Sequence, residues 1–380
     1  MNITIIGAGT AGLASAILLK RKGHEVDLYE QAKNPEPQGA GILLQPTGQV
    51  ILSQMGLLDS LKEISQPIHA LRGYNESHKT ITLLPYQNEV GYGVHRGNLF
   101  NLLLKTAKME GVNLHFNVKI DQLSLQNSNY SFPQIQDTPP DLIIFANGPH
   151  TELLEQTQIK FKSHVYPWGA LWAITPTSQC SNELRQLYKG TSKFIGLLPA
   201  GLHPINKVSC ESFFWSIHLN SLEKWNEQPL NKFKDQVLSL WPECTESMSK
   251  IDTKEQFIVS RYRDTVLKSY HHHNLVVLGD SAHAMSPQLG QGVSLALLDS
   301  FALSECLNKD ILSSLRNYEI SRKHHIQVYQ FLTRWLTPLY QSNYNMLAGP
   351  RNQAIKIGMS LPWFRKMILR TLSGRLGSIY

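Results

Sequence analysis

The hydrophobic and polar positions at the start of the chain form two strand-like runs with a helical repeat between them. Residues 2–6 (Asn-Ile-Thr-Ile-Ile) and 25–29 (Glu-Val-Asp-Leu-Tyr) are short and rich in apolar side chains. Residues 11–20 carry Ala, Leu and Ile at the spacing of a helix that packs on a sheet. The pattern predicts a β-α-β unit with buried parallel strands, which is typical of α/β proteins.

A glycine-rich turn lies between the first strand and the first helix, and it reads Gly-Ala-Gly-Thr-Ala-Gly over residues 7–12. Gly7 permits a tight turn, Gly9 lets a pyrophosphate approach the backbone, and Gly12 lets helix and strand pack closely. The free N–H groups at the helix N-terminus favour a phosphate. Glu30, at the tip of the second strand, is placed to accept hydrogen bonds from an adenosine ribose. The unit therefore predicts a dinucleotide site, which could hold NAD or FAD.

A second glycine-rich segment lies near residue 290. An apolar strand-like run at 274–278 leads into Gly279-Asp280, and Gly290-Gln291-Gly292 opens a long apolar helix. An NAD site is complete within one domain built from β-α-β units. The larger FAD has to be gripped again along its ribityl chain and ring. The two segments together therefore predict one FAD site.

The stretch from Val277 to Gly292, Val-Leu-Gly-Asp-Ser-Ala-His-Ala-Met-Ser-Pro-Gln-Leu-Gly-Gln-Gly, resembles the GD motif of single-component FAD-dependent monooxygenases, the family of p-hydroxybenzoate hydroxylase. The resemblance implies that Asp280 binds the ribityl hydroxyls and that the loop from Pro287 to Val293 passes beside the isoalloxazine ring. Glycine amides at a helix N-terminus can stabilise negative charge on reduced flavin. The catalytic side chains stay unknown, because the flavin carries the chemistry.

Two weaker matches lie between these segments. Residues 39–46 resemble the family segment that covers the flavin. Residues 95–99 resemble a second family segment, in which the Arg reaches the FAD pyrophosphate. The forked, permanently charged guanidinium of Arg96 suits a diphosphate. The residues expected to contact FAD are Gly7, Gly9, Thr10, Ala11, Gly12, Glu30, Gly41, Ile42, Arg96, Gly148, Gly279, Asp280, Pro287, Gly290, Gln291, Gly292 and Val293.

One element departs from the family pattern. After the strand at 141–146 the family has an Asp-Gly pair and, a few residues later, an Arg, both associated with FAD and NAD(P)H handling. This chain has Asn147-Gly148 and no Arg in residues 149–154. Asn keeps the turn geometry but loses the carboxylate charge. NADH or NADPH is the expected co-substrate, while a reductase partner or an unusual nicotinamide contact stays open.

The remaining pattern predicts two further regions. From Phe161 to Leu219, short apolar runs separated by Pro and Gly predict a mostly antiparallel sheet that roofs the flavin. The tail beyond Leu307 is predicted to be helical, from Leu312 through Trp335 and again after Pro362. The prediction is thus an α/β fold with a Rossmann-like FAD-binding domain like that of p-hydroxybenzoate hydroxylase, an inserted, mostly antiparallel β substrate domain and C-terminal helices. The expected boundaries are 1–160 with 271–310, then 161–270, then 311–380.

Composition adds limits on class and location. A length of 380 residues with 42% hydrophobic content is ample for a large core in two or three domains. We find no secretory signal and no apolar run long enough to span a bilayer. The four cysteines are scattered without metal or redox spacing, which predicts reduced thiols in a cytoplasmic protein. The run His271 to His273 precedes a strand as a polar loop would, so no metal site is expected.

The net charge of +7 raises the question of anionic partners. The basic residues are dispersed, with no arginine-rich arm or aromatic RNA-binding motif, so nucleic-acid binding is not expected. The C-terminal segment 362–372 is different, because it combines apolar residues at helical spacing, namely Trp363, Phe364, Met367, Ile368 and Leu372, with Arg365, Lys366 and Arg370. Such a helix docks its apolar face on the protein, or it makes a weak contact with a membrane or a partner.

The resemblance implies a FAD-dependent monooxygenase that hydroxylates an aromatic or polyketide-like small molecule with O2, through a C4a-hydroperoxyflavin. The pocket has to be dry, since water lets this adduct decay to hydrogen peroxide. Two alternatives stay open. One is a flavin oxidase, reductase or halogenase on the same scaffold, and the other is a FAD-binding protein without turnover.

Overall fold

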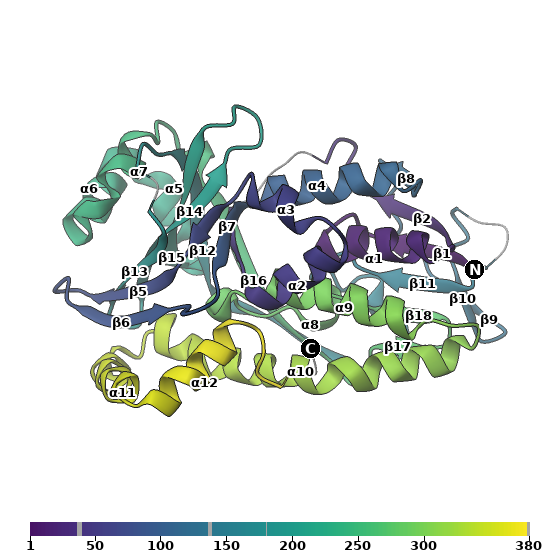
Figure 1. Ribbon diagram of the computed structural model, residues 1–380. Coiled ribbons are helices and arrows are strands. Elements are labelled where there is room, and N and C mark those ends of the chain that lie inside the picture. The colour runs from purple at the N-terminus through teal and green to yellow at the C-terminus, as the bar shows by residue number, and fades with distance from the viewer. Residues whose placement is uncertain (36–39, 136–138, 180, 378–380) are drawn as a thin grey trace.

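The computed structural model describes residues 1–380 except 36–39, 136–138, 180 and 378–380 (Figure 1). Its first sheet has the strand order β17-β18-β11-β1-β2-β8, in which every neighbouring pair is parallel except β17 with β18. The strands are β1 (Asn2–Ile6), β2 (Glu25–Glu30), β8 (Asn113–Phe116), β11 (Leu142–Phe145), β17 (His271–His272) and β18 (Leu275–Val277). The central strands β11 and β18 are fully buried, as expected for apolar runs in a parallel sheet.

Three helices pack together on this sheet. The helix α1 (Thr10–Arg21) contacts both α4 (Arg96–Met109) and α9 (Gly292–Cys306). The helix α9 is apolar nearly all round, and ten of its residues are buried. The pairing of α1 with α9 brings the two glycine-rich segments, more than 260 residues apart in sequence, to the same place in the fold (Figure 1).

A second sheet has seven strands in the order β16-β12-β15-β14-β13-β5-β6, antiparallel except for the pair β5 and β13. Its strands are β5 (Ala70–Asn75), β6 (Thr80–Pro85), β12 (Phe161–Pro176), β13 (Glu183–Lys189), β14 (Lys193–Leu202), β15 (Ser209–His218) and β16 (Ile258–Leu267). Residues 70–85 thus add two strands from the N-terminal part of the chain to the predicted substrate sheet. The exact domain boundaries stay a prediction.

The two faces of the second sheet have different neighbours. Alternate side chains such as Leu171, Phe213 and Trp215 pack on the helices α5 (Leu222–Glu227), α6 (Leu230–Leu240) and α7 (Thr245–Ser249). The other face contacts β3 (Gly41–Leu44), where Gly41 N donates to Ser212 Oγ at 3.0 Å. A small sheet of β3, β7 (Gly91–His95) and β4 (Gln66–Ile68) therefore packs on β14 of the second sheet, and β7 leads directly into α4.

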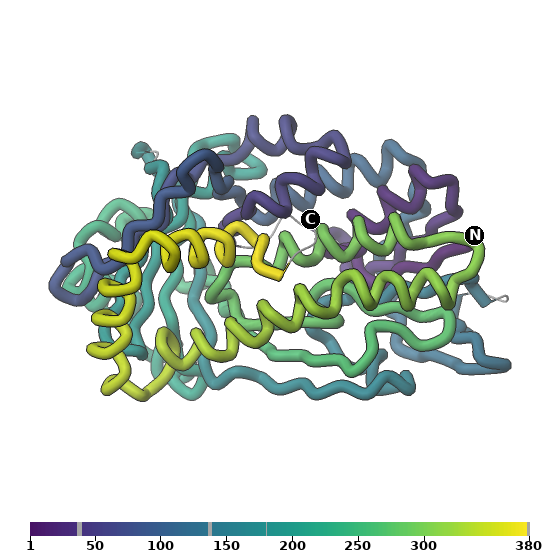
Figure 2. Tube along the Cα trace, turned by 60° about the horizontal axis from the view of Figure 1, so that its bottom comes forward, coloured from purple at the N-terminus to yellow at the C-terminus, as the bar shows by residue number. Residues whose placement is uncertain are grey.

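The smaller elements complete the fold. They are α2 (Pro46–Gln54), α3 (Leu58–Lys62), α8 (Asp280–His283) and the hairpin β9 (Ser124–Gln126) with β10 (Asn129–Ser131). The C-terminal region holds α10 (Ile311–Tyr340), α11 (Ala348–Ser360) and α12 (Pro362–Leu372), and Figure 2 shows α10 running along the molecule toward α11 and α12. Within the described residues, no helix is both long enough and apolar enough to cross a membrane.

Candidate functional site

In the N-terminal glycine turn, Gly7 and Gly12 lie tightly against other backbone atoms, whereas Gly9 has free space beside it. Gly7 has φ of +102°, and a Cβ there would lie 2.5 Å from Ala146 O. A Cβ on Gly12 would lie 1.9 Å from Gly7 O. At Gly9, by contrast, the nearest described atom would be Ala146 O at 3.9 Å. The structure therefore needs Gly7 and Gly12 for close packing, whereas Gly9 borders open space at the start of α1.

The electrostatics of this turn suit an anion. Within the described residues, α1 begins without a side-chain cap, and its first turn contains no acidic residue. Its first amides are therefore free to bind a phosphate group. The carboxylate of Glu30 accepts hydrogen bonds from Ala8 N and Ala32 N, both at 2.9 Å. Glu30 thus holds the turn in place, and its contact with a ribose stays a prediction.

The second glycine-rich segment lies against the first. Gly279 has φ of +57°, and a Cβ there would lie 3.0 Å from the Cβ of Ala11 in α1. The exposed carboxylate of Asp280 lies beside the start of α9, with Oδ1 3.9 Å from the position of a Cβ on Gly292. A Cβ on Gly290 would lie 3.8 Å from Gln45 Nε2. The fold therefore brings residues 7–12, 41–45 and 279–292 together.

The predicted contact residues differ in exposure. Gly9, Arg96, Asp280, Pro287 and Gly292 are exposed, whereas Gly7, Ala11, Gly12, Gly41, Gly279 and Gln291 are buried and shape the backbone. The others, Thr10, Glu30, Ile42, Gly148, Gly290 and Val293, are half-buried. The exposed members come from three parts of the chain, namely residues 7–12, Arg96 and residues 279–292, so each of these parts offers atoms that a ligand can reach.

Arg96 is the first residue of α4. Its backbone N donates to Ala40 O at 3.1 Å, which ties α4 to the segment before β3. The preceding residue, His95, caps the helix, with Nδ1 accepting from Gly97 N at 3.0 Å. Burial, and then the nearby His203, lower the pKa of His95 to about 4. His95 is therefore neutral at pH 7, as its role as a hydrogen-bond acceptor requires.

Asn147 joins the turn after β11 to the GD segment. Its Oδ1 accepts a hydrogen bond from Ser281 Oγ at 3.1 Å. Gly148, the next residue, has φ of +75°, so the tight turn of the Asn-Gly pair is present. The amide side chain thus provides a neutral link at the position where the family pattern has a carboxylate.

A buried ionic network that the sequence did not reveal holds the GD segment. Asp299 Oδ2 accepts from Gly279 N at 3.0 Å and lies 2.5 Å from His283 Nε2, while Oδ1 accepts from Arg322 Nε at 2.8 Å. Burial alone would raise the pKa of Asp299, but His283 and Arg322 outweigh it and hold the pKa at about 2. The carboxylate is therefore ionised. The buried His283 therefore has a packing and hydrogen-bonding role.

The same network continues to the C-terminal segment. Arg322 Nη1 lies 2.9 Å from His325 Nδ1, so Nδ1 accepts, and Nε2 donates to Gly374 O at 2.9 Å. Burial, followed by the charge of Arg322, lowers the pKa of His325 to about 4, so this imidazole is neutral. Gln291 Nε2 also donates to Leu372 O at 2.6 Å. The end of α12 and the residues after it therefore cover the loop that precedes α9.

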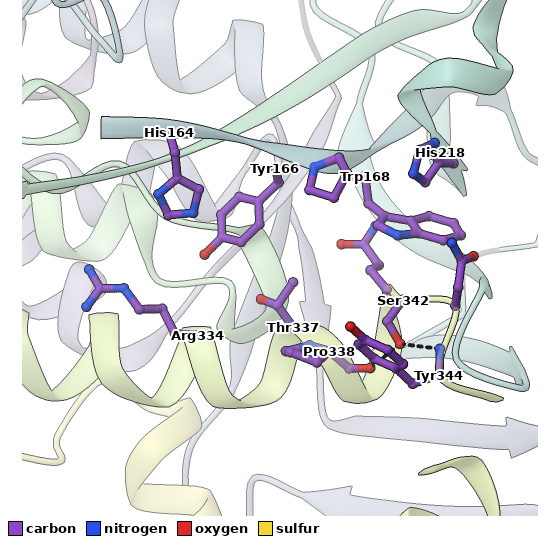
Figure 3. A pocket seen from close by; sticks show the side chains of 12 residues that line it. His164, Tyr166, Trp168, His218, Arg334, Thr337, Pro338, Ser342 and Tyr344 are labelled. Carbon is purple, nitrogen blue, oxygen red and sulfur yellow. Dashed lines mark hydrogen bonds between the residues drawn. The ribbon is translucent and has the colours of Figure 1, made fainter. Parts of the chain in front are cut away.

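A pocket of about 500 Å³ lies between β12 and the end of α10 (Figure 3). Its lining is His164, Tyr166, Pro167, Trp168, His218, Arg334, Thr337, Pro338, Gln341, Ser342, Asn343 and Tyr344. Two of these residues are bonded to the loop before α9. Thr337 Oγ1 lies 2.6 Å from Ser286 Oγ, and Gln341 Oε1 accepts from Gln288 Nε2 at 2.8 Å. The pocket therefore adjoins the loop that the family resemblance places beside the flavin ring.

The charges at this pocket are balanced. Arg334 donates twice to Asp264, from Nε at 2.6 Å and from Nη2 at 3.2 Å. Burial, and then the charge of Asp264, raise the pKa of Tyr166 to about 12, so its hydroxyl keeps its proton. Three of the twelve lining residues, Tyr166, Trp168 and Tyr344, carry aromatic rings, and Trp168 packs edge-on against His218. Such a pocket suits a planar ring compound with few charges.

The histidine run makes contacts within the protein. Tyr130 OH lies 3.0 Å from His272 Nδ1, and His271 Nε2 lies 3.6 Å from Glu319 Oε2. Across the described ranges, we find no cluster of three or more His, Cys, Asp or Glu side chains that could hold a metal ion.

The chain is similar in sequence to known FAD-dependent proteins. A family model described as "FAD binding domain" matches residues 1–328. A kynurenine 3-monooxygenase of Salinispora tropica is 26% identical over 363 residues, covering 86% of this chain and 77% of the relative. A FAD-dependent urate hydroxylase of Klebsiella pneumoniae is 24% identical over 341 residues, covering 85% of this chain and 86% of the relative.

Solved structures share the fold. A variant of Klebsiella pneumoniae HpxO complexed with FAD matches with a TM-score of 0.80 at 19% identity, over 99% of this chain and 100% of that chain. The tetrameric form of 2-methyl-3-hydroxypyridine-5-carboxylic acid oxygenase matches with a TM-score of 0.77 at 20% identity, over 100% of this chain and 98% of that chain. These matches confirm the predicted fold class.

Gly9 and Gly12 should respond differently to the same substitution. Gly12→Ala forces a Cβ into Gly7 O and should lower the free energy of unfolding of the apoprotein by about 1–3 kcal/mol. Gly9→Ala meets no such contact, so it should keep wild-type stability and lower FAD affinity roughly tenfold or more. Urea unfolding and titration with FAD measure the two quantities. A Gly9→Ala protein with wild-type FAD affinity would contradict this assignment.

His325 should make stability depend on pH. Its folded pKa of about 4 lies below the ordinary value of 6.5, so the unfolded chain binds its proton first. The contribution of neutral His325 to the free energy of unfolding is therefore lost as pH falls from about 6.5 to 4. Between pH 7 and 4 the wild type should lose about 2–3 kcal/mol more of its free energy of unfolding than His325→Asn. His95 titrates in the same range in both proteins and cancels. Parallel pH profiles would contradict the prediction.

Proposed function

The chain belongs to the FAD binding domain family, and we propose that it is a FAD-dependent monooxygenase that hydroxylates a small aromatic molecule. The family match confirms the prediction of a flavoprotein that binds FAD. The observation that carries the proposal is the meeting of the two glycine-rich segments beside an aromatic pocket. The names of the relatives, which include a kynurenine monooxygenase and a urate hydroxylase, support a substrate with a ring.

The residues at the site fit FAD. The open space at Gly9 and the uncapped start of α1 suit the pyrophosphate, with Arg96 as a second, cationic contact. Asp280 is exposed at the start of α9, where it would bind the ribityl hydroxyls. The loop from Pro287 to Val293 would lie beside the ring. When bound and reduced, FAD supplies the activation of O2 and the transfer of one oxygen atom to the substrate.

The protein's part in this reaction is to bind, to orient and to exclude water. The amides at the start of α9 are placed to stabilise negative charge at the ring edge. Thr337 and Gln341 brace the neighbouring loop through its residues Ser286 and Gln288. The C-terminal segment covers that loop through the hydrogen bond from Gln291 to Leu372 O. These contacts would keep the loop fixed and limit the entry of water, which otherwise diverts activated oxygen to hydrogen peroxide.

The pocket supports an uncharged or weakly charged aromatic substrate. Its cation, Arg334, is already paired with Asp264, and Tyr166 keeps its proton. The ring of such a substrate would lie against Trp168 and Tyr166. The bond from Gln341 Nε2 to Gly169 O, at 3.3 Å, ties the helix on one side of the pocket to the strand on the other. The pocket would therefore keep its width when a substrate binds.

The source of electrons and the location of the protein are parts of the same proposal. NADH or NADPH is the expected reductant. The neutral Asn147, held by Ser281, favours a weak nicotinamide contact and keeps a separate reductase as the second candidate donor. The four cysteines of the sequence are scattered without metal or redox spacing, which favours a location in the reducing cytoplasm.

Labelled dioxygen tests the proposed activity. The purified, FAD-loaded protein is incubated with NADH or NADPH and a mixture of small aromatic compounds under ¹⁸O2, and the products are analysed by mass spectrometry. We expect one product that gains one labelled oxygen, together with nucleotide oxidation that this substrate stimulates. Hydrogen peroxide formed in step with nucleotide oxidation, without a labelled product, would instead indicate an oxidase or reductase. A flavin that no donor reduces would indicate a non-catalytic protein.

A further inference from the structure

The positive charge of the chain is concentrated at its C-terminal end. Residues 320–380 contain nine Lys and Arg and no Asp or Glu. The other 319 residues hold 27 Lys and Arg against all 29 Asp and Glu, a net charge of −2. The net charge of +7 therefore comes entirely from the C-terminal helices and the residues that follow them.

Some of these cations are used inside the protein. Four of them form ion pairs, namely Arg322 with Asp299, Lys323 with Glu319, Arg334 with Asp264 and Arg375 with Glu89. Arg351 is buried, and its guanidinium lies over the rings of Tyr188 and Tyr340. The remaining four, Lys356, Arg365, Lys366 and Arg370, are exposed on α11 and α12, and none is paired with a described carboxylate. They form an uncompensated basic surface.

The helix α12 docks through one face and exposes the other. Ile368 and Leu372 pack against the core formed by Ile68, Leu84 and Leu198. The opposite stripe, at intervals of three and four residues, consists of Trp363, Lys366, Met367 and Arg370. Within it Trp363 is 64% exposed and Met367 is 41% exposed. The apolar residues of the predicted amphipathic helix therefore lie on two faces. Ile368 and Leu372 pack on the protein, whereas Trp363 and Met367 are exposed to solvent beside Lys366 and Arg370.

Neighbouring elements also carry exposed apolar residues. Of the 18 exposed large hydrophobic residues in the described part of the chain, ten lie within residues 312–367. They include Phe331 and Trp335 of α10, which contact each other, Met346 in the turn after α10, and Ile357 of α11. Figure 2 shows α10, α11 and α12 next to one another along one side of the molecule. A gathering of this kind marks a binding surface, whereas isolated exposed apolar residues do not.

We propose that α12, with the exposed apolar residues of α10 and α11, binds the surface of an anionic lipid bilayer. Trp and Met side chains would enter the headgroup region while Lys and Arg contact the lipid phosphates, as in helices that lie in the membrane interface. A nucleic acid would use the cations but would leave Trp363 and Met367 without an apolar environment. The charge and the apolar stripe together therefore favour a bilayer.

The proposed bilayer-binding surface lies close in the chain to the pocket, which suggests what bilayer binding would do for the protein. Tyr344 lines the pocket and is 63% exposed, and it lies in the chain between Trp335 and Met346 of the basic, apolar surface. A docked protein would thus present the pocket near the bilayer, where apolar ring compounds concentrate. The binding itself does not depend on the reaction, so a failure of either proposal leaves the other standing.

Vesicle sedimentation tests the proposal. The full-length, FAD-loaded protein is mixed with phosphatidylcholine vesicles that contain or lack phosphatidylglycerol. We expect sedimentation with the anionic vesicles alone, weakened by added salt. The double variant Lys366→Gln with Met367→Gln should reduce the partition coefficient at least about fivefold, the effect of one lost cation near such a surface.

The chain offers a matched control. Lys108 and Met109 form the same pair of residues at the end of α4, and both are exposed, Met109 to 76%. Lys108→Gln with Met109→Gln should bind the vesicles like the wild type, and all three proteins should retain the same FAD content. Equal sedimentation with both kinds of vesicle, or equal binding by the two double variants, would overturn the proposal. A protein that does not bind vesicles, but associates with itself or with duplex DNA, would also overturn the proposal if the double variant Lys366→Gln with Met367→Gln abolished that association.

Discussion

The buried carboxylate of Asp299 is the group on which the arrangement of the cofactor site depends. It lies in the apolar helix α9 and binds Gly279 N, His283 and Arg322 at once. A buried charge is costly unless it is paired and hydrogen-bonded, so the three partners must stay where they are. Through this one carboxylate the GD segment is fixed to α9 and α10, and through His325 the same network reaches Gly374.

Close backbone contacts supply the second constraint. Gly12 lets α1 approach the turn at Gly7, Gly7 lets this turn approach Ala146, and Gly279 lets the GD segment approach Ala11. The two glycine-rich segments come from distant parts of the chain and meet through the packing of α1 on α9. Some predicted contacts, such as Gly9 and Asp280, are exposed, while Gly7, Gly12 and Gly279, which set the backbone positions, are buried. The former are free to bind a ligand, and the latter are already used by the protein.

Local patterns and the family motif were enough to predict the strands β1, β2, β11 and β18, the glycine turns and two of the C-terminal helices. The histidine run was expected to be a loop, but His271 and His272 form the short edge strand β17, which pairs with β18. Other features depend on contacts that the sequence does not display. The strands β5 and β6 join the second sheet by a parallel pairing of β5 with β13, more than 100 residues away. The helix α11 begins Ala-Gly-Pro and has no continuous apolar stripe, and it lies between the two segments that were predicted to be helical. One feature of the sequence indicates the network of Asp299, because this acidic residue lies within the largely apolar helix α9.

One titration tests most directly whether the two glycine-rich segments share one FAD. ADP contains the adenosine and the pyrophosphate but lacks the ribityl chain and the ring, so it probes the N-terminal segment alone. Asp280→Ala should lower the affinity for FAD roughly tenfold or more, and it should leave the affinity for ADP at the wild-type value. Wild-type affinity of this variant for FAD, or an equal loss for FAD and ADP, would contradict a shared site.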